Sequence, residues 1–222
     1  MRRVRWAQAF RLIPTRYPPV PLFERLGDPS QWETIADIES LTNPRAREEL
    51  GDIAVVPAEQ RVSGPGATWV MAPFVHRRSS RFSDGSYGVY YAARRRPTAI
   101  AETRFHMARF YAASSELPLD VEMRVLVGAV DDRLHDLRGG DRRWSAVLDP
   151  DNYAAGWQLG AKLRAAGSRG LVYPSVRDQG GQCFAALTPR ATGLPASAGV
   201  LSYHWDGERV ARVFDYAAGE WL

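Results

Sequence analysis

The sequence contains a single cysteine, Cys183, so no disulfide can form within the chain and no pair of cysteines is available for a CxxC metal site. Its four histidines, His76, His106, His135 and His204, lack the spacing of zinc ligands. Cys183 lies in the segment QCFAAL, which predicts a buried strand with a small core side chain at this position. We therefore expect neither a metal centre nor a cysteine nucleophile.

Long apolar runs and common catalytic motifs are also missing. No stretch approaches the roughly 20 apolar residues that span a bilayer, and the basic segment MRRVRWAQAFRLIP has no apolar stretch of signal-peptide length. The sequence therefore predicts a cytoplasmic protein without a membrane partner. The phosphate loop GxxxxGK[ST], the metalloprotease motif HExxH and the nucleophile motif GxSxG are absent as well.

Lysine is nearly absent too: Lys162 is the only one, and arginine supplies almost all the positive charge of a chain with formal net charge +4. Arginine binds phosphates and carboxylates bidentately and stacks on rings. A basic surface of this kind suits nucleotides, nucleic acid or an acidic protein. Because the arginines are scattered and no recognised nucleic-acid motif occurs, we expect no direct binding to nucleic acid.

The elements that the sequence does contain predict one α+β domain over residues 1–222. A hydrophobic content of 45% suits a soluble domain with a substantial core. Proline, glycine and capping residues bound the expected helices, and β-branched or aromatic runs mark the expected strands. We expect helices over 28–41, 44–51, 97–111 and 152–166, and strands over 6–13, 67–75, 87–93, 121–130, 170–173, 183–187, 200–205 and 209–214.

The most informative stretch is SSRFSDGSYGVYYAARRRPTAIAET, residues 79–103. Tyr91 follows Arg81 by ten positions, and Glu102 follows Tyr91 by eleven. A cation, an aromatic face and a carboxylate can hold a diphosphate, stack on a base and steady a positively charged sugar. A turn around Gly85 would let the backbone approach a ligand closely.

Each of these residues also has an ordinary interpretation. Charge runs such as the one containing Arg81 are usually solvated faces, and an aromatic stripe on a strand, such as Tyr91 with Tyr87, is usually core. Glu102, early in a helix, would ordinarily be exposed or paired with His106 one turn on. The functional interpretation therefore depends on the three residues acting together.

The order of these residues resembles that of the RES-domain toxins of bacterial toxin–antitoxin systems. The resembling features are Arg81-Phe82 before a glycine turn, an aromatic strand with Tyr91, and Glu102 at a small-residue helix start. Pro174-Ser175 after a short strand and the early Phe10-Arg11 complete the pattern, which spans roughly residues 6–190. Residues 14–66 would be a helical insertion, and residues 198–216 an added C-terminal β-hairpin around Asp206-Gly207.

The resemblance implies a fold similar to ADP-ribosyltransferases, with a split mixed or antiparallel sheet, and an enzyme that uses NAD+ as its substrate. Arg81, Tyr91 and Glu102 would be catalytic, while Arg11 and Ser175 would join Arg81 and Tyr91 in binding NAD+. The implied partner is an antitoxin with a helix-turn-helix domain of the Xre type. The ADP-ribose acceptor stays open between water, inorganic phosphate and a protein. Two other possibilities remain: an ADP-ribosyltransferase with a specific protein target, and a basic module without catalysis that binds nucleic acid or a partner.

Overall fold

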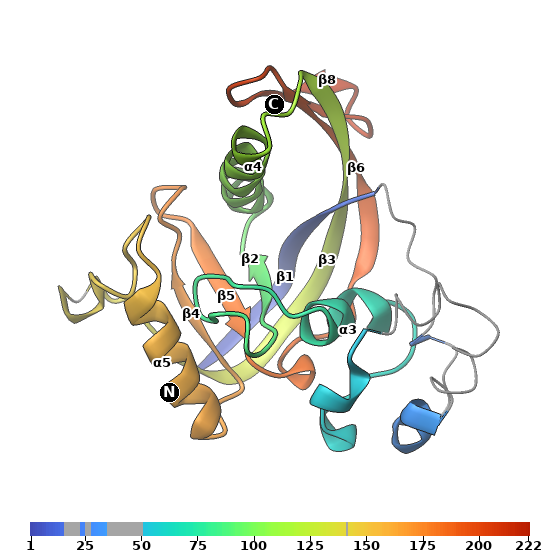
Figure 1. Ribbon diagram of the computed structural model, residues 1–222, viewed down its shortest axis with the longest axis vertical. Helices are drawn as coiled ribbons and strands as arrows, with labels where there is room; N and C mark the ends of the chain where they lie inside the picture. The colour runs from blue at the N-terminus through green and yellow to red at the C-terminus, as the bar shows by residue number, and fades with distance from the viewer. Residues whose placement is uncertain (16–22, 25–27, 35–50, 141) are drawn as a thin grey trace.

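The computed structural model describes residues 1–15, 23–24, 28–34, 51–140 and 142–222, and these form an α+β structure around one mixed sheet, as predicted. Figure 1 shows the arrangement. The strands are β1 (Arg2–Pro14), β2 (Tyr90–Ala93), β3 (Leu119–Asp136), β4 (Gly170–Pro174), β5 (Gln182–Ala186), β6 (Ala196–Trp205), β7 (Val210–Asp215) and β8 (Glu220–Trp221). The helices are α3 (Ala67–Val75), α4 (Arg96–Ala113) and α5 (Ala154–Ala165), with short 3-10 turns η1 (Pro29–Gln31), η2 (Ile53–Val55), η3 (Ala58–Gln60), η4 (Arg142–Trp144) and η5 (Pro189–Ala191).

The sheet has the order β1-β2-β5-β4-β3-β6-β7-β8, and β1 pairs with β3 as well as β2. The first five strands of this order therefore close on themselves. All pairings are antiparallel except the short one between β3 and β4, where His135 lies opposite Leu171. Closure places the ends of strands that are distant in sequence next to one another.

The closed part of the sheet separates two buried clusters, because successive side chains on a strand point to opposite faces. On β5, Cys183 belongs to one cluster and Phe184 to the other. On β2, Tyr91 packs on the Cys183 side and Tyr90 on the Phe184 side. Helices α4 and α5 contribute to the cluster of Cys183, whereas α3 contributes to that of Phe184. Accordingly, α3 and α5 lie on opposite sides of the molecule (Figure 1).

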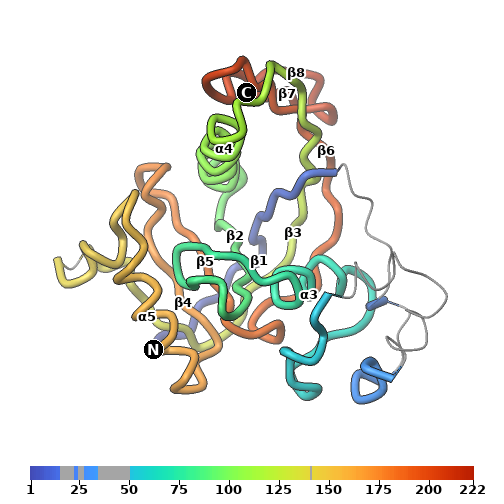
Figure 2. The backbone as a smooth tube through the Cα atoms, in the orientation of Figure 1, coloured from blue at the N-terminus to red at the C-terminus, as the bar shows by residue number. Residues whose placement is uncertain are grey.

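The C-terminal strands hold helix α4 in place, and Figure 2 shows β7 and β8 beside it at the end of the molecule far from the N-terminus. The Arg104 guanidinium donates to the carbonyl of Val210 at 2.6 Å. Arg96 pairs with Asp215, and the hydroxyls of Thr103 and Tyr203 lie 2.8 Å apart. Strands β6 and β7 pair around Asp206-Gly207, and this hairpin fixes the helix that carries Glu102.

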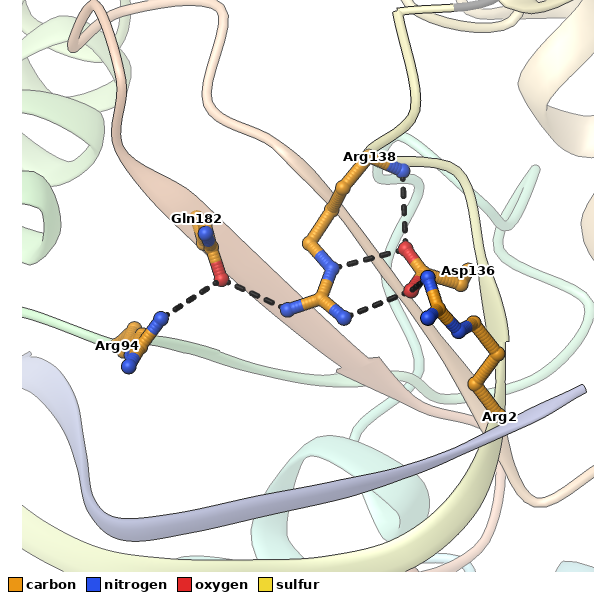
Figure 3. A network of polar contacts seen from close by, with 5 residues as sticks. All are labelled: Arg2, Arg94, Asp136, Arg138 and Gln182. Carbon is orange, nitrogen blue, oxygen red and sulfur yellow. Dashed lines mark hydrogen bonds and ion pairs between the residues drawn. The ribbon is translucent and has the colours of Figure 1, made fainter.

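A polar network fastens the ends of several strands (Figure 3). Arg138, just after β3, donates to both carboxylate oxygens of Asp136 at 2.8 and 2.7 Å. It also donates at 2.8 Å to the side-chain oxygen of Gln182 on β5, which accepts from Arg94 at 3.4 Å. Hydrogen bonds from Arg138 hold the pKa of Asp136 below its usual value, and Arg2 on β1 lies 3.8 Å from the same carboxylate. The network therefore joins β1, β3 and β5 to the chain after β2.

Most expected elements are confirmed, but the strand expected at 67–75 is wrong: this segment is the helix α3. A short apolar run does not by itself distinguish a buried helix from a strand. Val70, Met71 and Phe74 are all buried, so the segment has no exposed face. Its sequence therefore shows neither the 3.6-residue period of a surface helix nor the two-residue alternation of a half-buried strand. Gly66 begins the helix with the positive φ of 89° that glycine adopts without strain.

About half of the predicted insertion over residues 14–66 falls outside the described residues, including all but the last residue of the helix expected over 44–51 and half of that over 28–41. The described parts hold η1, η2, η3 and a helical turn at 32–34. Arg61 is buried there and donates to the carbonyls of Val56 and Pro29 at 2.8 Å each. The helical character of the insertion as a whole stays a prediction.

Two glycines let α5 pack directly on the chain around Arg81. A Cβ added at Gly156 would lie 2.2 Å from the Arg81 carbonyl oxygen, and one at Gly160 would lie 2.0 Å from that of Phe82. No side chain larger than hydrogen fits at either position without movement of backbone. The position of the turn at residues 80–83, which we call the Arg81 turn, thus depends on glycine in a helix over 70 residues later in the sequence.

We predict that Gly156→Ala forces α5 and the Arg81 turn apart and lowers the free energy of unfolding by roughly 1–3 kcal/mol, the usual range for overpacking. Urea denaturation followed by circular dichroism measures the change. Gly139→Ala is the control, because a Cβ there meets nothing within 4 Å and φ is not positive. A Gly156→Ala protein as stable as the Gly139→Ala protein would contradict this packing.

Candidate active site

A cavity of about 730 Å³ lies on the Cys183 side of the sheet, between α4 and the segment leading into α5. It brings together four of the five predicted site residues, since Arg11, Arg81, Tyr91 and Glu102 all border it. The fifth, Ser175, is hydrogen-bonded to Glu102. The other residues of the wall are Phe10, Leu12, Ser79, Ser80, Ala92, Ala93, Ala99, Thr103, His106, Arg109, Asp151, Asn152, Tyr153, Trp157, Tyr173 and Cys183.

Helix α4 presents one face to this cavity. The bordering residues Ala99, Glu102, Thr103, His106 and Arg109 recur at steps of three and four, the spacing of one helical face. The helix begins after an extended Arg95 with proline in its first turn, as the sequence predicted. The cavity wall therefore carries a carboxylate, an imidazole and a guanidinium along two turns.

The carboxylate of Glu102 is held by Ser175. The Ser175 hydroxyl oxygen accepts the backbone N–H groups of Arg177 at 3.1 Å and Asp178 at 3.0 Å, and it lies 2.6 Å from Oε1 of Glu102. A serine hydroxyl has two lone pairs and one proton. Because both lone pairs are engaged, the proton points to Glu102, so Ser175 is the donor and Glu102 the acceptor.

The turn that contains Ser175 is itself fixed to the start of α4. The Thr98 hydroxyl donates to the Asp178 carboxylate at 2.5 Å, and Arg95 pairs with the same carboxylate at 3.3 Å. A backbone hydrogen bond of 2.9 Å from Ser175 to Gly181 closes the turn. Thr98 and Arg95, both at the N-terminal end of α4, therefore hold the turn against this helix, and Ser175 meets Glu102 as a result.

Cys183 is buried, as the sequence predicted, but it also borders the cavity with its sulfur 3.6 Å from Oε1 of Glu102. Burial, together with the nearby Glu102 carboxylate, raises the pKa of the thiol far above its usual range. The thiol stays protonated at neutral pH and donates weakly to the carboxylate. This agrees with a core residue and not with a nucleophile.

Arg81 is nearly buried, with 7% of its surface exposed, and much of its guanidinium is engaged. One amino group donates to the Asp149 carbonyl at 2.8 Å, and the guanidinium carbon lies 4.6 Å from the centre of the Tyr153 ring. The indole of Trp157 donates at 2.7 Å to the carbonyl of Ser80. The residues around the start of α5 thus hold the Arg81 turn, and no local sequence pattern had linked the two segments.

The hydroxyl of Tyr91 is tied to the same turn. It accepts the backbone N–H of Phe82 at 3.0 Å and lies 2.9 Å from the hydroxyl of Ser80. Burial raises the pKa of the phenol far above its ordinary value, so it stays neutral. Tyr91 therefore connects strand β2 to the turn that carries Arg81, in addition to bordering the cavity.

Arg11 borders the cavity from β1, but its guanidinium is directed mainly at β2. It donates to the Tyr91 carbonyl at 2.9 Å, and its guanidinium carbon lies 4.6 Å from the centre of the Tyr90 ring. Its Nε is buried and makes no hydrogen bond within the described residues. Burial lowers the pKa of this guanidinium.

Several residues of the wall were not predicted from the sequence: Thr103, Arg109, Asp151, Tyr153 and Trp157. A helical projection of α4 from Glu102 would have found Thr103 and Arg109, because both share its face. The residues near α5 had no such signal, since they reach the site through contacts between helix and turn. Within the described ranges, no group of three or more His, Cys, Asp or Glu residues could hold a metal ion, and no helix is long and apolar enough to cross a membrane.

We predict that Tyr91→Phe lowers the free energy of unfolding by roughly 1–3 kcal/mol, because the Phe82 N–H loses its acceptor in a buried place. Urea denaturation measures the change. Tyr153→Phe is the matched control: its hydroxyl makes no hydrogen bond in the described part of the chain, and phenylalanine keeps the ring beside Arg81. Equal stability of the two variants would show that the Tyr91 hydroxyl does not support the turn.

Comparison with known proteins agrees with the pattern of the sequence. Residues 58–206 match the RES domain. The chain is 30% identical over 217 residues to the uncharacterized protein y4oC of Sinorhizobium fredii (strain NBRC 101917 / NGR234), covering 95% of this chain and 89% of that protein.

Among solved structures, the chain is similar to one in the crystal structure of the M. tuberculosis MbcT–MbcA toxin–antitoxin complex. The TM-score is 0.46 and the identity 12%, over 92% of this chain and 87% of that one. The match over residues 58–206 includes Arg81, Tyr91, Glu102 and Ser175. The protein belongs to the RES domain family.

Proposed function

We propose that this protein is a toxin that cleaves the bond between nicotinamide and ribose in NAD+ and so depletes the cell of NAD+. The observation that carries the proposal is the Glu102 carboxylate, fixed by Ser175 at 2.6 Å in a cavity that it shares with Arg81 and Tyr91. Membership of the RES domain family supports it. The fold similar to ADP-ribosyltransferases, which the resemblance implies, is part of the proposal.

Glu102 supplies the electrostatic stabilisation in this scheme. Cleavage of a bond at the anomeric carbon passes through an oxocarbenium-like state, in which positive charge develops on the ribose. An enzyme accelerates the step by stabilising that state more than the ground state. Oε1 of Glu102 is engaged by Ser175, while Oε2 makes no hydrogen bond within the described residues. Oε2 is thus free to accept from a ribose hydroxyl next to the developing charge.

The other site residues bind and orient the substrate. Arg81 keeps N–H donors beyond the one that it gives to Asp149, and these bind phosphate or ribose oxygens. Tyr91 packs against the nicotinamide ring, with its hydroxyl anchored in the turn. Ser175 orients Glu102, and Arg11 supports β2 and adds positive charge at the cavity edge. Nicotinamide leaves as a neutral molecule, so no strong general acid is required.

The biological part of the proposal is the partnership with an antitoxin, which in proteins of this type carries a helix-turn-helix domain. Action on the NAD+ pool places the protein in the cytoplasm. The ADP-ribose acceptor divides two versions of the function: phosphate or water gives depletion of NAD+, and a protein acceptor gives a transferase with a specific target.

We predict that Glu102→Gln lowers nicotinamide release from NAD+ roughly 100-fold or more, the range for loss of one key electrostatic contact in a transition state. Glutamine keeps an oxygen that can accept from Ser175, so the substitution removes charge with little change of shape. Release is followed by chromatography, with circular dichroism to verify folding. Glu208→Gln in the exposed β6–β7 turn is the control and should keep full activity. Full activity of Glu102→Gln would exclude the assigned role.

We predict that nicotinamide release by the wild-type protein accelerates when inorganic phosphate is added, because phosphate is a better nucleophile than water toward an oxocarbenium-like centre. The product would be a phosphorylated ADP-ribose, identified by mass spectrometry. Release that is indifferent to phosphate would indicate hydrolysis. Label from NAD+ that appears on a protein band in a lysate would instead support the transferase version.

A further inference from the structure

The cavity contains one arginine, Arg109, whose guanidinium makes no hydrogen bond or ion pair within the described residues. Arg11 and Arg81 donate to backbone carbonyls, as described above. Arg109 is exposed and makes no hydrogen bond or ion pair within the described residues; its recorded contact is with the ring of Phe105, 5.7 Å from the guanidinium carbon. A guanidinium that borders a cavity in this way has its donors available for a ligand.

The position of this guanidinium along α4 follows from helix geometry. Side chains on a helix lean toward its N-terminus, and the contact with Phe105 places the charged group of Arg109 one turn back along the helix. The backbone of Arg109 is seven residues beyond Glu102, which is roughly 10 Å along the axis at about 1.5 Å per residue. A ligand that reaches both groups must therefore carry negative charge several ångströms from its sugar.

Neighbouring cations strengthen the positive potential at this end of the cavity. The guanidinium carbon of Arg177 lies 3.3 Å from the centre of the Phe105 ring, so Phe105 contacts two guanidinium groups. Partial removal of the imidazole from water lowers the pKa of His106. The nearby Glu102 carboxylate raises this pKa, and the positive charges of the three arginines Arg177, Arg81 and Arg109 lower it further. The positive charges of these three arginines thus act on the imidazole at the cavity wall.

Few acidic groups offset this charge. Asp151 also borders the cavity, but it is highly exposed and lies 3.7 Å from Arg177. Arg177 also donates to the carbonyl of Pro150 at 2.5 Å. Glu102 lies at the other end of the face that α4 presents to the cavity, where Ser175 holds it. The part of the cavity next to Arg109 therefore favours an anion.

We propose that Arg109 binds the diphosphate of NAD+, so that α4 holds the dinucleotide along its length with the nicotinamide ribose at Glu102. This inference rests on the proposed function. The diphosphate is joined to the ribose through its 5′ carbon and lies away from the anomeric carbon, which matches the separation of Arg109 from Glu102. An acceptor phosphate would have to contact the anomeric carbon itself, close to Glu102.

The test is binding of ADP-ribose, which contains the diphosphate but not the bond that is cleaved. Isothermal titration calorimetry should show that Arg109→Ala weakens binding roughly 10- to 100-fold relative to wild type, the range for loss of one hydrogen-bonded charge. Binding to Arg109→Ala should also depend less on salt concentration. Arg133→Ala, an exposed arginine on β3 outside the cavity, is the matched control and should bind as wild type does.

Titration of His106 by NMR provides a readout that a purely structural role of Arg109 would not move. ADP-ribose should raise the pKa of His106 in the wild-type protein, because it brings negative charge beside the imidazole. In Arg109→Ala, the free protein should already show a higher pKa than wild type, because a cation is removed. His106→Gln identifies the resonance. An unchanged His106 pKa in both comparisons would overturn the proposed position of the diphosphate.

Failure of this inference and of the proposed function give different results. Wild type that cleaves NAD+, with Arg109→Ala equal to it in ADP-ribose affinity and KM, would overturn the role of Arg109 alone. Weaker binding of inorganic phosphate without weaker binding of ADP-ribose would overturn the diphosphate assignment in favour of an acceptor site. Wild type that neither cleaves NAD+ nor binds ADP-ribose would overturn both proposals.

Discussion

The double pairing of β1, with β2 on one edge and β3 on the other, is the constraint on which the rest of the structure depends. Closing the strands on themselves fixes which side chains face α4 and α5 and which face α3. Because alternation on a strand is strict, Tyr91 and Cys183 must face the same side once β2 pairs with β5. A shift of β2 by one residue against β5 would move Tyr91 to the opposite cluster and remove it from the wall of the cavity.

Hydrogen bonding then fixes the side chains around the cavity to different degrees. The Ser175 hydroxyl has every donor and acceptor position engaged, and the Tyr91 hydroxyl holds a backbone N–H and a second hydroxyl. Groups satisfied in this way occupy one position before any ligand arrives, which lowers the entropy lost on binding. Arg109 has no such constraint, so the cavity combines a preorganised end at Glu102 with an adaptable arginine whose backbone lies two turns further along α4.

Much of this arrangement could be predicted from the sequence, because the relevant signals are local. Pro97 marked the start of α4, aromatic or apolar runs marked β2 and β5, and Asp206-Gly207 marked the turn between β6 and β7. The grouping of Arg81, Tyr91 and Glu102 depended on their order along the chain, and the structure places all three around one cavity. Their chemical roles stay predictions until activity is measured.

The features that the sequence did not predict have a different physical origin. The segment 67–75 is mostly apolar because α3 is buried on most sides, so its sequence shows no periodicity. The contribution of residues 149–157 depends on Gly156 and Gly160, which let α5 approach the backbone of the Arg81 turn. Such an approach is a property of two distant segments together. A glycine within a helix, considered without its tertiary contacts, indicates only that the helix is less stable.

The same reasoning explains why α4 is the element that unites structure and chemistry. One face of it supplies Glu102, His106 and Arg109 to the cavity, while other contacts tie it to the C-terminal strands through Arg96 and Arg104. The helix is therefore held to β7 by an ion pair from Arg96 and by a hydrogen bond from Arg104. A carboxylate whose catalytic value depends on ångström-scale placement gains from a rigid element that is fixed elsewhere. The C-terminal hairpin, which lines none of the cavity, thus contributes to the site through the helix that it holds.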